Sequence, residues 1–149
     1  MTDKPDTPAE LKARALRHLV RREHSRAELA RKLAPHAESQ AAVEATLDLL
    51  LSKRQQSDER FAEERARSLS RKYGPAMIRR DLQARGISEE LIERLPAGDE
   101  LDRARAILAR KYRAPSSSRE EAAKRARFLQ GRGFSYDIIK RALAIDDAE

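Results

Sequence analysis

The side chains that could perform acid–base or metal chemistry are few in this sequence. The 149 residues include no cysteine and only three histidines, His18, His24 and His36. All three histidines lie near the start of the chain, and none has the spacing of zinc ligands, so we interpret each as an ordinary surface histidine. Paired carboxylates such as Glu63-Glu64 and Glu89-Glu90 fall at helix starts or on exposed faces. We therefore expect no catalytic residue and no metal ligand.

The classes of protein that remain are limited further by what the chain lacks. Without thiols there is no disulfide and no cysteine nucleophile, which fits a reducing compartment. Residues 1–10 have neither the basic nor the apolar region of a signal peptide, and no apolar run approaches the roughly 20 residues of a membrane span. No glycine-rich phosphate loop follows a strand pattern. We expect a cytoplasmic protein without a cofactor and without membrane contact.

Basic side chains are the remaining candidates for function. The formal net charge is +7 and 38% of the residues are charged, a balance that favours an anionic partner. We predict that the contacts to this partner come from eight residues between positions 71 and 127: Arg71, Lys72, Arg79, Arg80, Arg110, Lys111, Arg125 and Arg127.

The elements that position these side chains are predicted to be helices throughout. Apolar residues recur at helical spacing, as in Val43, Leu47, Leu50 and Leu51, and no segment alternates as a strand does. Nine helices are expected, and each follows a start signal of the kind that caps helices. Three of these signals have the capping-box pattern, and they begin at Thr7, Ser25 and Ser118. In the first helix we expect Leu16, Leu19 and Val20 to share one face.

The helices are predicted to form three related units of three. Residues 69–73 (Leu-Ser-Arg-Lys-Tyr) parallel residues 108–112 (Leu-Ala-Arg-Lys-Tyr), and residues 82–88 parallel residues 129–135. The first unit is more divergent, with Ser25 at the position of Gly74, as terminal repeats often are. We place the three-helix repeats at 8–56, 57–97 and 98–145.

Charge alternates along these repeats. The segments that hold the first two helices of each repeat, 12–34, 60–85 and 103–132, carry net charges of +6, +5 and +8. The segments that hold the third helices carry −3, −5 and −2. One interpretation is that the charges keep a thin-cored protein soluble and pair between neighbouring repeats. The other is a basic strip along one side of the molecule, suited to an extended anion such as a nucleoprotein filament.

Direct reading of a DNA sequence is disfavoured. Residues 75–95 have the outline of a helix-turn-helix, but the second helix carries Glu89, Glu90 and Glu93 against the single Arg94. An acidic helix in the major groove would be repelled by phosphates and would offer few donors to guanine. A protein-binding module and a sequence-independent nucleic-acid-binding protein with helix-turn-helix-like repeats stay open.

The order and spacing of several short segments, from about residue 13 to residue 143, resemble the RecX family of RecA recombinase modulators. Two departures are the polar stretch 52–57 and the acidic tail after Leu143. The segments that carry the resemblance are Ser25-Arg26-Ala27-Glu28-Leu29, Asp58-Glu59-Arg60-Phe61-Ala62, Lys72-Tyr73-Gly74-Pro75, Arg85-Gly86-Ile87 and Arg132-Gly133-Phe134.

The resemblance implies an all-α fold of three tandem three-helix repeats in an elongated, curved body. It also implies binding within the groove of a RecA filament on DNA, with inhibition of ATP hydrolysis, strand exchange and co-protease activity, and it carries no catalytic residue. We accordingly expect a non-enzymatic monomer whose partner is the RecA filament, together with single- or double-stranded DNA.

Overall fold

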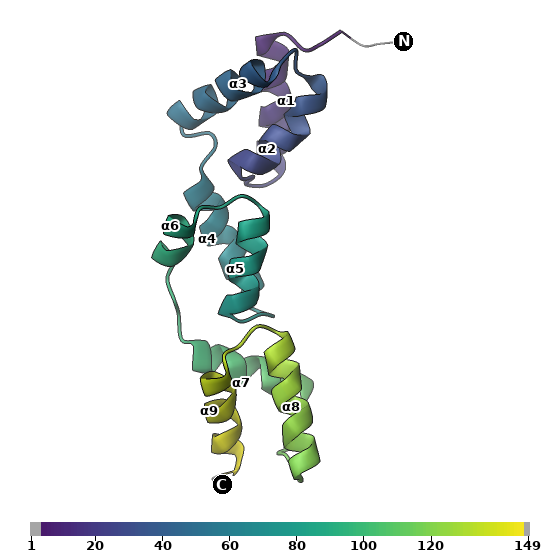
Figure 1. Cartoon of the computed structure of the whole chain (residues 1–149), viewed down its shortest axis with the longest axis vertical. Helices are drawn as coiled ribbons and strands as arrows, with labels where there is room; N and C mark the ends of the chain where they lie inside the picture. Colours follow the sequence, from purple (N-terminus) through teal and green to yellow (C-terminus); the bar gives the residue numbers. More distant parts are fainter. Residues whose placement is uncertain (1–3, 148–149) are drawn as a thin grey trace. The chain divides into compact units, whose positions relative to one another are not determined.

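The computed structural model describes residues 4–147, and their side chains through residue 144. Within these residues the chain forms nine α-helices, one short 3-10 helix and no strand, so the all-α prediction is confirmed (Figure 1). The elements are α1 (Pro8–Arg21), α2 (Arg26–Leu33), η1 (Ala34–His36), α3 (Gln40–Ser52), α4 (Asp58–Leu69), α5 (Pro75–Ala84), α6 (Glu89–Arg94), α7 (Glu100–Lys111), α8 (Arg119–Gly131) and α9 (Tyr136–Asp147).

Two of the three predicted capping boxes are complete. The Thr7 and Ser25 hydroxyls each accept from the backbone N–H three residues on, and Glu10 and Glu28 accept in return from the cap backbone. Ser118 accepts from the N–H of Glu121, but the return bond is absent among the described contacts. The Glu121 carboxylate lies 3.3 Å from the Arg125 guanidinium instead. The prediction of a third capping box is therefore wrong in its second half.

The described residues separate into two compact units. The first comprises the chain up to Glu64 together with Leu82–Glu93, and the second comprises Arg65–Asp81 together with the chain from Arg94 onward. Both units thus take part of the middle repeat, with a division inside α4 and another inside α5. The repeat boundaries that the sequence suggests stay a prediction.

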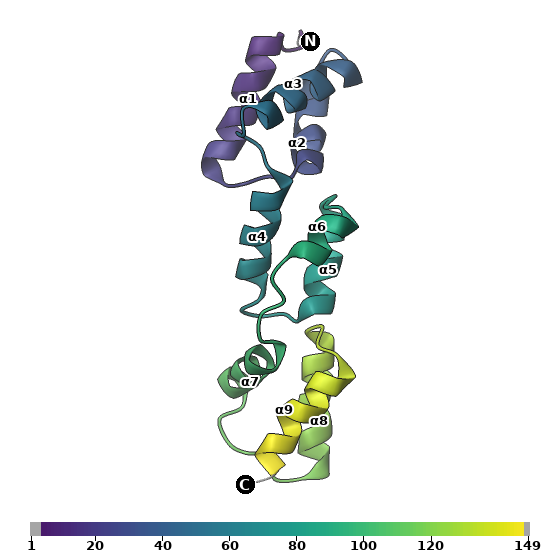
Figure 2. The same ribbon diagram turned by 90° about the vertical axis from the view of Figure 1, so that its left-hand side faces the viewer.

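The core of the first unit lies between α1, α2 and α3, which pack against one another (Figure 2). On α1 the buried side chains are Leu11 and Ala15, four residues apart. Val20 is 85% exposed and Leu51 is 52% exposed, so these two apolar residues lie outside the buried core. The buried residues that form the cluster between these three helices are Leu11, Ala15, Leu29, Leu33, Val43, Leu47 and Leu50.

The core of the second unit lies where α9 packs on α7 and α8. Helices α8 and α9 are neighbours in Figure 1, and α9 crosses in front of α8 in Figure 2. The buried residues come from all three helices and from the turn before α9: Ala104, Ile107, Leu108, Leu129, Phe134, Ile138, Ile139 and Ala142.

Each unit joins its two stretches of chain in the same way. An Arg-Gly turn follows the second helix of one repeat and packs on the start of the second helix of the preceding repeat. We call these contacts the joints. The first joint sets Ser25–Glu28 against Arg85–Gly86, and the second sets Gly74–Met77 against Arg132–Gly133. The Ser25 hydroxyl donates to the carbonyl of Arg85 over 2.7 Å. The N–H of Gly74 donates to the carbonyl of Arg132, also over 2.7 Å.

Glycine is required in both turns. Gly86 and Gly133 have φ of +82° and +96°, backbone angles that residues with a Cβ atom rarely adopt. A Cβ on Gly86 would lie 2.5 Å from the Cβ of Ala27, and one on Gly133 would lie 2.6 Å from Met77. The Arg-Gly pairs of the sequence therefore mark places where one backbone approaches another closely.

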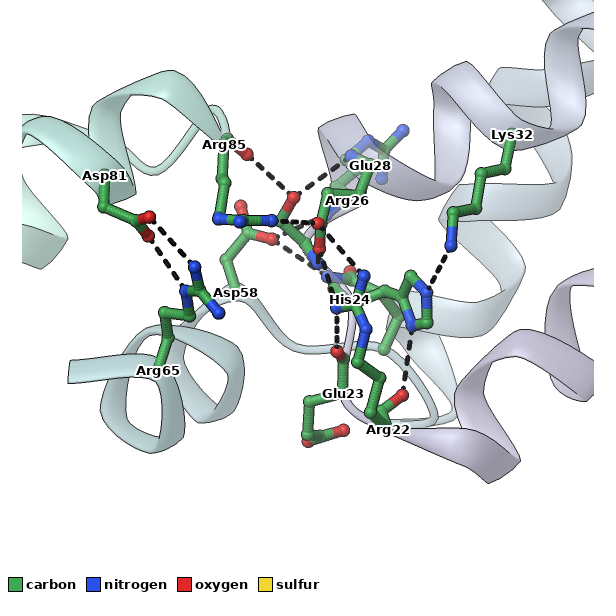
Figure 3. A network of polar contacts seen from close by, with 12 residues as sticks. Arg22, Glu23, His24, Arg26, Glu28, Lys32, Asp58, Arg65, Asp81 and Arg85 are labelled. Carbon is green, nitrogen blue, oxygen red and sulfur yellow. Dashed lines mark hydrogen bonds and ion pairs between the residues drawn. The ribbon is translucent and has the colours of Figure 1, made fainter. Parts of the chain in front are cut away.

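The first joint also contains a buried carboxylate (Figure 3). Glu28 is 8% exposed and accepts from Arg85 over 2.7 Å and from both terminal nitrogens of Arg22. Burial by itself raises the pKa of Glu28, but hydrogen bonds from Arg22, from the Ser25 backbone and from Arg85 outweigh it and hold that pKa below its ordinary value. Glu28 is therefore an ionised link between α2 and the turn after α5.

Buried polar contacts extend from this joint to the turns on either side of α2. Gln56 is 2% exposed, and its amide donates to the carbonyl of His24 and to Asp58. Asp58 accepts in addition from the backbone N–H of Arg26, over 2.8 Å. The start of α2 and the start of α4 are thereby fixed to each other.

His24 is buried, which corrects the expectation that it lies on the surface. It is 2% exposed; Nδ1 lies 3.0 Å from the carbonyl of Arg22 and Nε2 lies 3.0 Å from the ammonium of Lys32. Because an ammonium only donates, Nε2 is the acceptor and the ring is neutral. Burial lowers the pKa of His24. The ring serves as a packing and hydrogen-bonding group of the first unit.

Replacing Gly133 by Ala should destabilise the second joint. The positive φ and the approach to Met77 should together lower the free energy of unfolding by about 2 kcal/mol or more. Gly131 is a matched control, because a Cβ there meets nothing within 4 Å. Gly131→Ala should leave stability unchanged or raise it by up to about 1 kcal/mol. Urea unfolding followed by circular dichroism measures both, and equal effects would contradict the account of this joint.

Replacing Glu28 by Gln should weaken the first joint and make the free energy of unfolding less sensitive to acid. The folded-state pKa lies below the unfolded one of about 4.3, so the stability from Glu28 is present above that pH and is lost as pH falls through the folded value. Glu28→Gln should cost about 1–3 kcal/mol at pH 7 and remove part of the loss below about pH 5. Glu63→Gln, on the exposed face of α4, should change stability by less than about 0.5 kcal/mol. A Glu28→Gln variant that unfolds in acid just as the parent does would refute this role.

Candidate functional site

All eight basic residues that the sequence predicts as contacts belong to the second unit. Six of them are exposed, and Arg79 is half-buried. Four come from the turn after α4 and from α5, and four come from α7 and α8. They are Arg71 and Lys72 in the turn, Arg79 and Arg80 on α5, Arg110 and Lys111 at the end of α7, and Arg125 and Arg127 on α8.

Arg125 differs from the rest because it is only 4% exposed. Its guanidinium lies 4.6 Å from the centre of the Tyr112 ring and donates to the carbonyl of Ala114 over 2.7 Å. The side chain is thus folded back over the end of α7 and is not exposed on the surface of α8. Sequence reasoning sees helical spacing but not the aromatic ring that covers the side chain.

The turn after α4 meets the end of α7 and the end of α8. The Arg110 guanidinium donates to the carbonyl of Arg71, and the Arg132 guanidinium lies 3.5 Å from the carbonyl of Lys72. Arg71, Lys72 and Arg110 are therefore neighbours, as the prediction requires. Arg80 is exposed on α5, and no hydrogen bond or ion pair described for the chain joins it to this group.

Arg132 belongs to the same group, although sequence reasoning did not place it among the contacts. Its guanidinium lies 5.3 Å from the ring centre of Tyr73 and 5.1 Å from that of Phe128. The signal in the sequence is the parallel with Arg85, the arginine of the first joint. At the second joint Met77 stands near the turn and no carboxylate takes the place of Glu28, so Arg132 lies on aromatic rings instead.

Aromatic rings also hold Lys111. Its ammonium lies 4.3 Å from the centre of the Phe128 ring, and the Phe128 and Tyr112 rings meet edge to face at 5.9 Å. Such contacts orient a cation without neutralising it. We call these cations, together with the predicted and exposed Arg127 of α8, the basic surface; it consists of Arg71, Lys72, Arg110, Lys111, Arg127 and Arg132.

The basic surface has the chemistry of a site for an anion. Among the residues that the structure describes, none of its six cations forms an ion pair with a carboxylate. Cations of this kind contact phosphates or carboxylates of a partner, with an affinity that falls as salt rises.

Between residues 4 and 147, no group of three or more His, Asp or Glu side chains is arranged to hold a metal ion. Nor does any helix in that range combine the length and apolar character that a membrane crossing needs.

Comparisons with known proteins identify relatives over nearly the whole chain. Models of the first, second and third three-helix domains of RecX match residues 12–50, 57–95 and 98–143. Among curated proteins, the regulatory protein RecX of Ralstonia nicotianae is 42% identical over 97% of this chain and 92% of its own length. The regulatory protein RecX of Herbaspirillum seropedicae is 45% identical over 93% of this chain and 92% of its own.

A solved structure shows the same fold. The crystal structure of RecX from Lactobacillus salivarius aligns with a TM-score of 0.82 over 95% of this chain and 97% of that one, at 22% sequence identity. Together with the three matched domains, this likeness confirms a fold of three three-helix repeats.

Proposed function

The chain belongs to the RecX family of regulatory proteins, and from this membership we propose that it regulates RecA recombinase. In this proposal the chain binds the filament that RecA forms on DNA and does no chemistry of its own. It reduces ATP hydrolysis, strand exchange and co-protease activity by RecA. Action on RecA places it in the cytoplasm, and we expect it to act as a monomer.

The observation that supports the proposal most strongly is the unpaired charge of the basic surface. A RecA filament on DNA is an extended anion, because the DNA phosphates repeat along it. We propose that the basic surface faces the DNA-bearing groove. The acidic segments that hold α3, α6 and α9 would point away from the DNA or contact basic parts of RecA.

A second candidate function is sequence-independent binding to nucleic acid without RecA. The grouping of cations with Tyr73, Tyr112 and Phe128 favours it, since stacking rings and cations are the usual parts of single-strand sites. Direct reading of base pairs remains disfavoured, because α6 has Glu90 and Glu93 exposed.

Reversing two exposed charges of the basic surface should weaken the regulation. We predict that Lys72→Glu with Arg127→Glu raises the concentration needed for half-inhibition of RecA ATP hydrolysis on single-stranded DNA by about tenfold at low salt. The difference should shrink as salt rises, since exposed charges are screened. A titration of each protein at two or more salt concentrations measures it.

The matched control is Arg17→Glu with Arg31→Glu, two exposed residues of the first unit that change the net charge equally. This control should inhibit nearly as well as the parent. Equal losses in both variants would show that total charge matters and its location does not. Tight binding to bare DNA without any effect on RecA would replace the proposal by the second candidate.

A further inference from the structure

A small pocket lies in the second unit, at the end of α7. Its volume is about 220 Å³, and its walls come from α7, the loop after it, α8 and Ala142 of α9. Most of the lining is apolar, but three arginines enter it: Arg105, Arg113 and Arg125. Neither the sequence prediction nor the proposed function assigns this pocket a role.

Arg125 gives the pocket a buried and rigid donor. The side chain is fixed by the Ala114 carbonyl at 2.7 Å and by Glu121 at 3.3 Å, both on one terminal nitrogen. Its Nε is buried and has no hydrogen-bond partner among the described residues. A buried N–H without an acceptor costs free energy, so such groups in native proteins call for an explanation.

Arg105 repeats this pattern from the opposite helix. Its Nε is likewise buried without a described partner. The Asp102 carboxylate is 3.9 Å away and its side chain is 70% exposed. Arg113, in the loop, is exposed and forms no ion pair among the described residues. Three arginines thus line one pocket, and the carboxylates described near them are Asp99, Asp102 and Glu121.

We infer that this pocket binds one phosphate group of a nucleic-acid strand. A phosphate presents its oxygens tetrahedrally and can accept from arginines on several sides, whereas a carboxylate presents two oxygens in one plane and suits a single guanidinium. The volume is below the roughly 300–1,000 Å³ of pockets for larger ligands, so it admits a phosphate with part of its sugar.

A strand bound in this pocket continues naturally onto the basic surface. The Lys111 ammonium lies 5.9 Å from the centre of the Tyr112 ring, and Tyr112 lines the pocket. The next phosphates of the strand would therefore meet cations, which favours a nucleic-acid backbone over a free anion. This inference does not depend on RecA being the partner.

The test uses the whole protein and a fluorescein-labelled 20-nucleotide oligo(dT). Arg105→Gln with Arg113→Gln should raise the dissociation constant about tenfold at low salt. It should also reduce the slope of log affinity against log salt by about 0.7, the value for one single-strand phosphate. Arg67→Gln with Arg141→Gln removes two exposed charges of the same unit outside the pocket and should change the constant by less than about threefold.

A second readout observes the pocket directly. In nitrogen-15 spectra of arginine side chains, the Nε–H signals of Arg105 and Arg125 should shift when oligo(dT) is added. Equal losses of affinity in the two double variants, or oligo(dT) binding with both signals unmoved, would overturn the inference. So would a polyglutamate peptide that shifts both signals while oligo(dT) does not, because the pocket would then take an acidic protein segment. Since RecA is absent, none of these results bears on regulation of RecA.

Discussion

The close packing of an Arg-Gly turn on the start of an earlier helix is the contact on which the rest of this structure depends. The chain has only six aromatic residues, and its helices bury thin layers of leucine, isoleucine and alanine. Such layers alone give few constraints on how successive repeats meet. The two joints supply those constraints with a hydrogen bond to the carbonyl of the arginine in each turn and with glycines at positive φ, which is how each unit unites two separate stretches of chain.

The two joints share geometry but differ in charge, and this difference shapes the site. In the first joint Glu28 pairs with Arg85, and this ionic contact stabilises the unit. In the second joint the equivalent arginine, Arg132, meets Tyr73 and Phe128 and keeps its charge. The arginine of the Arg-Gly turn thus stabilises the first unit, and its equivalent in the second unit contributes a cation to the basic surface.

Local signals in the sequence were sufficient to predict the helices and their start residues, including the Thr7 and Ser25 capping boxes. They were insufficient wherever a distant segment decides the environment of a side chain. Burial of His24 depends on Gln56 and Lys32, and burial of Arg125 depends on Tyr112 and on the loop after α7. Arg132 was missed as a cation of the site because only the joint reveals that it lacks a carboxylate.

Hydrogen–deuterium exchange of the chain, alone and on RecA filaments assembled on single-stranded DNA, tests the central claim most directly. The account predicts slower exchange on the filament in the turn at residues 70–74, at the end of α7 and at the end of α8, the segments that carry the basic surface. Protection confined to α1, α2 and α3, or no change on filaments at saturating concentration, would contradict it.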